Sequence, residues 1–222
     1  MNRTKILKEI ASHILSLKLC HPIRVGTDGI TASGKSTFVR ELADQLSISG
    51  RQIITTTLDG FHNPRSRRYE RGRDSAEGYY RDAYNYPSII RHLLEPLGPG
   101  GSLSFKTKVF DLSEDIEVDA SPETAAKDAI LLVDGSFALR TELRPYWDVG
   151  IYLDVDFSVA EERASVRDAA AFGSPEMAKS VTQNRYHGAH RIHKIEAAPE
   201  EGASFVIRNT EPSHPEILAR RV

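Results

Sequence analysis

The stretch Gly29-Ile30-Thr31-Ala32-Ser33-Gly34-Lys35-Ser36 decides the fold of this chain of 222 residues. It has a glycine, four intervening residues and then Gly-Lys-Ser, which is the full pattern of a phosphate-binding P-loop. A short apolar run at residues 23–25 precedes it, and apolar residues at helical spacing follow it at Phe38, Val39, Leu42 and Leu46. The loop therefore joins a predicted strand to a predicted helix, which is the context that gives the pattern its meaning.

Backbone N–H groups of such a loop converge on phosphate, and the helix N-terminus adds partial positive charge. We expect the loop and Thr37 to bind the phosphates of a nucleotide. The Lys35 ammonium is expected at the β- and γ-phosphates, and the Ser36 hydroxyl on Mg²⁺. The alternative is an ordinary glycine turn followed by a surface lysine.

Apolar, β-rich runs recur along the chain, and helical patterns separate them. After the first run they lie at residues 53–58, 129–133, 149–153 and 205–207. Short apolar strands that alternate with helices are typical of a parallel sheet covered on both sides. We predict an α/β P-loop NTPase fold, a doubly wound, mainly parallel sheet of about five strands with helices on both faces. Residues 103–110 and 116–118 are predicted to pair as a small antiparallel flap.

Aspartates end four of the predicted strands, and ligands of such sheets bind beyond the carboxyl ends of the strands. They are Asp28, Asp59, Asp134 and Asp154. Asp134 fits the carboxylate that holds Mg²⁺, and Asp154 has a weaker claim because its strand is expected farther from the loop. Asp59 is expected near the γ-phosphate, where it can accept the proton of an acceptor hydroxyl. The alternative for each is a carboxylate that caps a helix or a turn.

The charge balance and the single cysteine bound the class of protein. There are 29 basic and 31 acidic residues, so no global field draws the chain toward nucleic acid or an anionic membrane. Cys20 cannot form an intramolecular disulfide, which suits a reducing compartment, and the longest apolar run, residues 129–133, is too short to span a bilayer. We expect a cytoplasmic protein whose partner is a small-molecule acceptor, with no nucleic acid and no membrane; a homo-oligomer stays open.

Seven segments form a set: Gly29–Thr37, Leu58–His62, Asp134-Gly135, Arg163-x-x-x-Arg167-Asp168, Arg68–Gly72, Ser75–Tyr84 and Lys108–Asp111. The last three are long and unusual, hence specific. Together they resemble the uridine kinase and pantothenate kinase group of P-loop kinases, bacterial uridine kinase-like proteins above all. The resemblance runs over nearly the whole chain after residue 22. It implies a single kinase domain over residues 1–222, with an acceptor-binding insertion at about 60–120 and a helical lid at about 163–195.

The resemblance also implies roles for single residues. Asp59 would be the catalytic base, and Lys35 and Ser36 would meet phosphate and metal. Arg163 and Arg167 would lie in or beside the lid and neutralise the transferring phosphoryl group. On their spacing alone, these two arginines could equally form a solvated helix face.

The acceptor side departs from the uridine kinase pattern. Tyr79 and Asp115 stand where the well-studied uridine and cytidine kinases carry a ribose-binding aspartate and a pyrimidine-reading histidine. Six residues are candidates for acceptor binding, namely His62, Arg65, Glu77, Tyr79, Tyr80 and Phe110. A carboxylate such as Glu77 could take over sugar binding, and an aromatic ring could stack on a base or belong to the core.

Two cationic stretches have several readings. Five arginines lie between residues 65 and 73, and they fit a solvated loop, a nucleic-acid contact or a clamp for an anionic acceptor in which Arg65 is the first candidate. His187, His190 and His193 are expected on a solvated cationic helix face rather than at a metal. Residues 209–212 are expected to border the adenine.

Segments of the Asp-x-x-Gly and Asn-Lys-x-Asp type, which a GTPase switch would carry, do not occur in the sequence. We therefore predict an ATP- and Mg²⁺-dependent kinase that phosphorylates a hydroxyl of a nucleoside such as uridine. A kinase of another small alcohol, pantothenate or a sugar, is the alternative enzyme. A nucleotide-binding ATPase or regulator without an acceptor is the alternative from another class.

Overall fold

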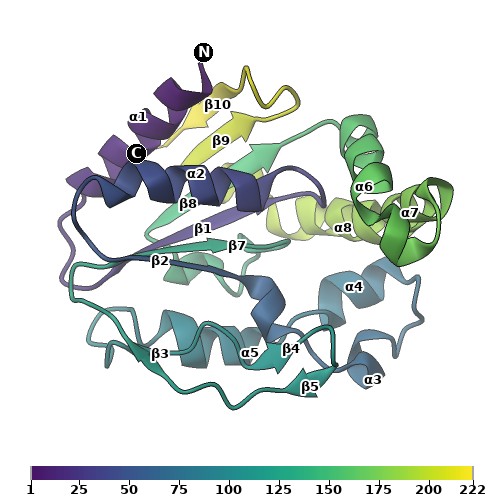
Figure 1. The fold of residues 1–222 in the computed structure, drawn as a ribbon, viewed down its shortest axis with the longest axis horizontal. Coiled ribbons are helices and arrows are strands. Elements are labelled where there is room, and N and C mark those ends of the chain that lie inside the picture. The colour runs from purple at the N-terminus through teal and green to yellow at the C-terminus, as the bar shows by residue number, and fades with distance from the viewer. Residues whose placement is uncertain (1, 222) are drawn as a thin grey trace.

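A six-stranded sheet forms the centre of the computed structural model, which describes residues 2–221 (Figure 1). The strand order is β10-β9-β8-β1-β7-β2, and all neighbours are parallel except the antiparallel pair of β9 and β10. The strands are β1 (Ile23–Gly29), β2 (Ile53–Thr57), β7 (Ile130–Asp134), β8 (Val149–Asp154), β9 (Phe205–Arg208) and β10 (Glu216–Arg220). The predicted fold class and its five strands are confirmed.

Strand β10 is the element that the sequence pattern misses. It lies at the edge of the sheet, and its residues alternate between exposed and half-buried. Glu216 and Arg220 stand at its two ends, and Leu218 is exposed. Its apolar run, residues 217–219, is only three residues long between charged residues, and in an edge strand with one side toward water none of these residues is fully buried.

Helices cover both faces of the sheet, as predicted. The longer ones are α1 (Arg3–Ser16), α2 (Lys35–Ser47), α6 (Phe157–Phe172) and α8 (Gly188–Ala197). The shorter ones are α3 (Arg65–Arg68), α4 (Ala76–Asp82), α5 (Tyr86–Ile89), α7 (Pro175–Val181) and α9 (Pro199–Gly202). There are also 3₁₀ turns at Leu58–Phe61 and Arg144–Tyr146, and π-helical turns at Ile90–Leu94 and Thr182–His187.

The sheet separates two large clusters of buried apolar side chains, and the run Ile130–Val133 contributes to both. Ile130 and Leu132 pack in the cluster under α1 and α2, whereas Leu131 and Val133 pack in the cluster that contains α4 and α5 residues. Successive side chains of a strand point to opposite faces, so a strand covered on both sides must be apolar throughout. This is why the central strands read as continuous apolar runs.

The flap differs from the predicted pairing. Strand β4 (Phe110–Asp111) pairs with β5 (Ile116–Glu117), but β3 (Ser104–Phe105) pairs with β6 (Glu123–Thr124). Two amides of the segment between β3 and β4 are used elsewhere, since the Lys106 amide donates to the His92 carbonyl and the Val109 amide to the Gly60 carbonyl. The Val109 carbonyl still accepts from the Val118 amide. The expected single hairpin is thus two short ladders.

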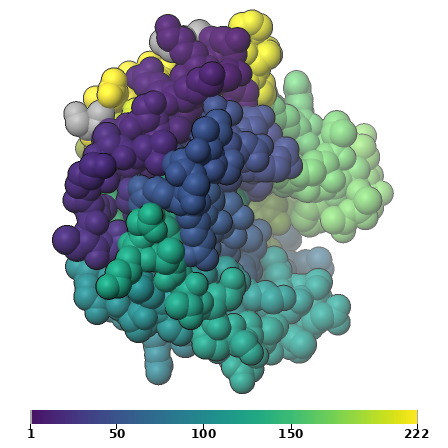
Figure 2. Space-filling model, turned by 60° about the vertical axis from the view of Figure 1, so that its left-hand side comes forward, coloured from purple at the N-terminus to yellow at the C-terminus, as the bar shows by residue number. Residues whose placement is uncertain are grey.

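Helices α6 and α7 project from the sheet beyond its carboxyl edge (Figure 1). Gly173, with φ of +90°, ends α6 and lets the chain turn into α7. The chain then returns through the π-helical turn and α8 to the sheet. In the space-filling view this projection stands apart from the flap, with a notch between them (Figure 2). Within residues 2–221 no helix has the length and apolar character needed to cross a membrane.

Candidate active site

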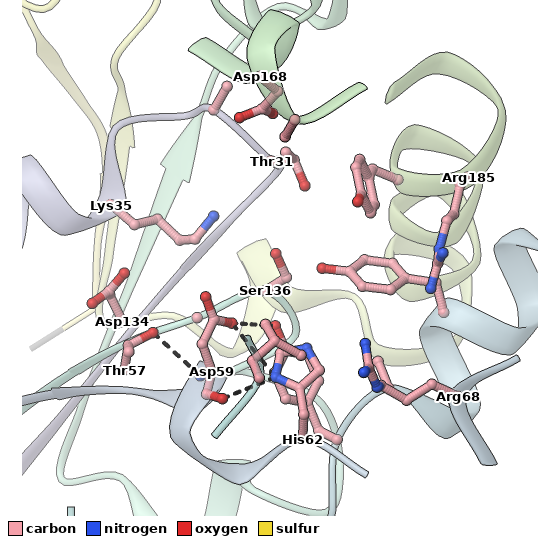
Figure 3. A pocket seen from close by; sticks show the side chains of 18 of the residues that line it. Thr31, Lys35, Thr57, Asp59, His62, Arg68, Asp134, Ser136, Asp168 and Arg185 are labelled. Carbon is pink, nitrogen blue, oxygen red and sulfur yellow. Dashed lines mark hydrogen bonds and ion pairs between the residues drawn. The ribbon is translucent and has the colours of Figure 1, made fainter. Parts of the chain in front are cut away.

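A cavity of about 310 Å³ lies beyond the carboxyl ends of β1, β2 and β7. The P-loop, the segments after β2 and β7, and residues of α4, α6 and the π-helical turn line it. Figure 3 shows the Lys35 ammonium and the Asp59 carboxylate pointing into the same space, with Arg68 and Arg185 on the opposite side. The fold therefore brings together most of the groups that the sequence singled out.

The P-loop follows β1 directly and continues into α2. Gly29 has φ of +150°, and a Cβ on it would lie 2.7 Å from the Leu153 carbonyl oxygen. The close approach of β8 to the loop therefore requires glycine at this position. Lys35 Nζ donates to the carbonyls of Gly29 and Ile30, both at 2.9 Å, so the ammonium lies over the loop.

Burial lowers the pKa of the Lys35 ammonium, and the carboxylates of Asp28, Asp134 and Asp59 act against this shift. An ammonium partly removed from water gains most from an anion placed beside it. The site thus suits the terminal phosphates of a nucleotide, and the loop geometry fits such a ligand.

Ser36 and Asp134 place two oxygen-bearing side chains together beside the P-loop. The Ser36 hydroxyl donates to Asp134 Oδ2 at 2.7 Å, and burial raises the pKa of the Asp134 carboxyl. A hydroxyl and one carboxylate suit Mg²⁺, which keeps waters and phosphate oxygens as its other ligands. In the chain from residue 2 to 221 no group of three or more His, Cys, Asp or Glu side chains could hold a metal alone. The residues present therefore fit a cation that arrives with the nucleotide.

Asp59 lies in the 3₁₀ turn that follows β2; its side chain is 57% exposed and lines the cavity. The Tyr84 hydroxyl donates to Asp59 Oδ1 at 3.1 Å, and His62 Nδ1 lies 3.0 Å from the Asp59 carbonyl oxygen. The neighbours fix the carboxylate while one oxygen stays accessible from the cavity. This is the geometry that a general base requires.

Two of the six candidate acceptor residues, His62 and Tyr79, line the cavity. Burial lowers the pKa of His62, so its imidazole is held neutral beside Asp59. The Tyr79 ring lies 4.8 Å from the Tyr186 ring and 5.4 Å from the Phe137 ring, and burial raises the pKa of its hydroxyl. Tyr79 and Tyr186 form an aromatic wall of the cavity that Asp59 also lines, and the buried Phe137 ring packs against Tyr79 from outside the lining.

The other four candidates lie outside the cavity and are corrected. Arg65 is exposed, and only its backbone amide is used, donating to Asp115. Glu77 is exposed and pairs with Arg81 at 2.9 Å. Tyr80 is 2% exposed and packs against Phe137, whereas Phe110 is buried in the flap and borders a different hollow. Adjacent positions on a helix or strand point different ways, which separates Tyr80 from Tyr79.

Arg68 and Arg185 are cavity residues that sequence reasoning did not select. Both are buried, at 6% and 7% exposure, and Arg68 pairs with Asp115 at 2.6 Å. The Arg185 guanidinium lies over the rings of Tyr69, Tyr79 and Tyr186, at 4.9, 5.2 and 5.8 Å from their centroids. The other four arginines of the cluster, Arg65, Arg67, Arg71 and Arg73, are exposed, as the solvated reading expected, although Arg65 and Arg67 lie in α3 rather than in a loop. Nothing in the spacing distinguishes Arg68 from them.

Arg163 and Arg167, both on α6, have different surroundings. Arg167 donates to Asp168 at 2.7 and 2.8 Å and lines the cavity together with Lys35. Arg163 instead donates to the carbonyls of Asn209 and Thr210, at 3.3 and 2.7 Å. Asn209 in turn donates to the Ser33 carbonyl at 2.8 Å, so the segment after β9 lies against the P-loop.

The three histidines of the π-helical turn at Thr182–His187 and of α8 are buried, and the expected solvated face is wrong. His187, His190 and His193 are 0%, 1% and 0% exposed. Burial lowers the pKa of His187 and of His190, so both rings are held neutral. Burying a neutral imidazole costs much less free energy than burying a cation, which explains how a segment rich in histidine can be buried.

A family model described as "Phosphoribulokinase / Uridine kinase family" matches residues 25–187 of the chain, from β1 to the end of the lid's π-helical turn. The chain belongs to this family. Membership of the phosphoribulokinase and uridine kinase family agrees with the P-loop and with the α/β fold described above. The resemblance drawn from the sequence is thereby confirmed.

Curated relatives that match the chain at low identity are uridine kinases by name. The chain is 28% identical over 159 residues to "Uridine-cytidine kinase B" of Dictyostelium discoideum, with 69% of the chain and 61% of that protein covered. It is 29% identical over 151 residues to "Uridine kinase" of Clostridium novyi (strain NT), with 68% and 70% covered. The chain thus matches somewhat under two thirds of the first relative's length.

Solved structures share the fold. A possible uridine kinase from Bacillus stearothermophilus superposes with a TM-score of 0.71 at 20% identity, covering 91% of this chain and 97% of that one. Phosphoribulokinase from Rhodobacter spheroides gives 0.58 at 14% identity, covering 91% and 76%. At such identities the likeness concerns the fold alone.

Proposed function

We propose that the protein transfers the γ-phosphoryl group of ATP to a hydroxyl of a small acceptor, with a nucleoside such as uridine as the first acceptor. The observation that carries the proposal is the single cavity into which Lys35, Asp134 and Asp59 all open. One wall has the chemistry of a phosphate and metal site, and the other holds an accessible carboxylate. A site for hydrolysis alone would not need a second, aromatic wall.

Asp59 is the proposed catalytic base. Its accessible oxygen takes the proton from the acceptor hydroxyl while the Tyr84 hydroxyl holds the other oxygen in place. Bound Mg-ATP supplies the phosphoryl group and a divalent cation that offsets its charge. Lys35 and Arg167 stabilise the negative charge that spreads over the phosphoryl oxygens, and Ser36 and Asp134 orient the metal.

The lid's contribution follows from its position above the P-loop. Arg167 comes from α6, while Arg185 and Tyr186 come from the π-helical turn, so movement of one segment would bring all three toward the cavity. Closure of such a segment excludes the water that would otherwise hydrolyse the triphosphate. We propose residues 163–195 as this lid, and residues 60–120 as the acceptor-binding insertion of a single kinase domain.

The choice of a nucleoside rests on the relatives' names and on the aromatic wall of Tyr79 and Tyr186, which offers a face for a base. Tyr79 stands at the place of the ribose-binding aspartate of uridine kinases. That departure favours a second candidate, a kinase of another small alcohol such as pantothenate or a sugar.

The test is an acceptor screen with purified protein and Mg-ATP. Uridine, cytidine, pantothenate and simple sugars are supplied in turn, and both ADP and the phosphorylated product are measured. ADP and phosphorylated uridine formed in equal amounts support the nucleoside proposal, and product with another alcohol supports the second candidate. ADP formed without any acceptor, or no ADP under all conditions, would contradict the kinase proposal and leave an ATPase or a regulator.

A further inference from the structure

Asp28 and His193 form a fully buried pair beneath the P-loop. Asp28 is the penultimate residue of β1, and His193 lies in the second half of α8. His193 Nε2 lies 2.9 Å from Asp28 Oδ2, and both side chains are 0% exposed. A buried carboxylate is costly unless it is paired and hydrogen-bonded, so the pair needs a structural or functional reason.

The Asp28 carboxylate holds two separate segments of the site. Oδ1 accepts from the amides of Gly29, at 2.6 Å, and Phe137, at 3.1 Å, while Oδ2 also accepts from the Leu139 amide at 2.8 Å. Phe137 has φ of +68°, a conformation that is strained for an aromatic residue. Asp28 therefore fixes both the first residue of the P-loop and the turn that follows the metal-binding strand β7.

A short chain of contacts connects His193 to the proposed phosphate-binding ammonium. His193 contacts Asp28, Asp28 accepts from the Gly29 amide, and the Gly29 carbonyl accepts from Lys35 Nζ. The charge of Asp28 is also the largest of the effects that raise the pKa of Lys35 against its burial. His193 lowers the pKa of Asp28, against the burial that would raise it, so the carboxylate stays ionised.

Helix α8 continues directly from the turn that carries Arg185 and Tyr186, both of which line the cavity. The His193 ring is packed between the sheet and the acceptor side, 5.2 Å from the Phe137 ring and 5.8 Å from the Tyr80 ring. Its second nitrogen, Nδ1, is buried without a partner in the described chain. Within the described chain, the contact with Asp28 is therefore the one hydrogen bond of the ring.

We propose that Asp28 and His193 are a positioning pair that couples the lid's last helix to the P-loop. The pair holds α8 and its π-helical turn at a fixed distance from Gly29 and Lys35. Arg185 and Tyr186 on that turn thereby keep a constant position relative to the phosphate site. This inference rests on the proposed function in one respect, since it takes Lys35 as the residue that meets the nucleotide's phosphates. It assigns to both residues a role that needs no contact with a substrate.

Two substitutions of His193 separate this role from simple packing. A glutamine side chain can place its amide nitrogen near the position of Nε2, whereas asparagine is too short and reaches only the position of Nδ1. His193→Gln should therefore retain the donor to Asp28, and His193→Asn should lose it. Tyr152→Phe is the matched control, because it removes the 2.6 Å contact between the Tyr152 hydroxyl and His190 in the same buried cluster without touching the P-loop.

The experiment measures the dissociation constant of Mg-ATP by calorimetric titration, and the melting temperature, for the wild type and each variant. His193→Asn should weaken Mg-ATP binding by about tenfold, the size expected when one hydrogen bond to a charged group is lost. His193→Gln should restore most of the affinity. Tyr152→Phe should lower the melting temperature and leave the affinity unchanged.

Asp28→Asn completes a double-mutant cycle with His193→Asn. Combined with His193→Asn it should weaken Mg-ATP binding no more than the stronger of the two single changes, because both act through one contact. Equal Mg-ATP affinity in the wild type, His193→Asn and His193→Gln, with losses of melting temperature like that of Tyr152→Phe, would overturn the positioning role and leave the proposed function standing. A folded wild type that does not bind Mg-ATP would overturn both.

Discussion

Gly29→Ala tests how tightly the P-loop is held against the sheet. The new Cβ would lie 2.7 Å from the Leu153 carbonyl oxygen and 2.7 Å from Ser33 Oγ, which is about 0.7 Å short of the 3.4 Å at which ordinary contact begins. The clash with Leu153 involves backbone of the central strand β8, so the loop has to move rather than the strand. The Gly29 carbonyl, which accepts from Lys35 Nζ, would move with it.

The expected magnitude follows from this displacement. A misplacement of about 1 Å in a catalytic arrangement can cost on the order of a hundredfold in rate, so a shift of about 0.7 Å should lower kcat/KM by roughly tenfold or more. Backbone strain of about 1–3 kcal/mol should accompany it. For a chain of this size each kcal/mol corresponds to a fall of about 2–4 °C in melting temperature.

Gly50→Ala is the matched control. Gly50 has φ of +73°, so alanine there is also strained, but its Cβ would meet no atom within 4 Å. The assay measures kcat/KM with Mg-ATP and the best acceptor, alongside thermal unfolding. Gly50→Ala should lose stability and keep its activity. If Gly29→Ala loses stability as Gly50→Ala does and retains full activity, the inferred tight placement of the P-loop is refuted.

Further predictions concern the metal ligand, the lid and the acceptor wall. Because its folded-state pKa is raised, the Asp134 carboxyl contributes stability that is fully present below the ordinary value of 3.8 and is lost as the pH rises through its raised pKa. Asp134→Asn should remove that loss in chemical denaturation measured between acidic and neutral pH, while phosphoryl transfer falls; an unchanged pH profile would contradict it. Arg167→Ala should lower kcat by about 10² or more and leave Mg-ATP affinity nearly unchanged. Arg163→Ala should chiefly raise the KM for ATP. Equal effects of the two changes in steady-state kinetics would contradict the different positions of these side chains. Arg185→Met should raise the acceptor KM without altering Mg-ATP binding, and a change confined to ATP binding would show that the tyrosine-lined guanidinium does not face the acceptor.

The donor half of the site could be predicted from the sequence because it is local. A P-loop lies within eight consecutive residues, and its strand and helix adjoin it. Asp134 and Asp59 follow apolar runs that are legible on their own, and parallel strands bring their carboxyl ends to one edge. For these residues chain order and spatial order agree.

The acceptor half could not be predicted, because its contacts join distant segments. Arg68 and Asp115 are 47 residues apart. The sequence pattern gives no sign that this one arginine of the cluster is buried and pairs with a residue of the flap. The buried histidines were misread for a related reason. On a helical pattern their residue type suggested charge, but packing against Asp28, Tyr152 and Phe157 decides that they are buried.

The contact between Asp28 and His193 beside the P-loop could not be predicted either. Asp28 was noted as a strand-end carboxylate among others, yet its partner His193 lies 165 residues away. Sequence spacing cannot show that two such residues meet. The contact becomes visible only when β1 and α8 are placed in the same fold.

The central claim is that Asp59 deprotonates the acceptor hydroxyl in a site that binds Mg-ATP independently. Asp59→Asn keeps the shape of the side chain and its contact with the Tyr84 hydroxyl but removes the base. The most direct measurement follows phosphorylated acceptor formed per unit time by this variant and by the wild type, with Mg-ATP binding titrated on the same samples. The account predicts unchanged Mg-ATP affinity and a rate lower by about 10²–10⁴. Transfer at the wild-type rate by Asp59→Asn would contradict it.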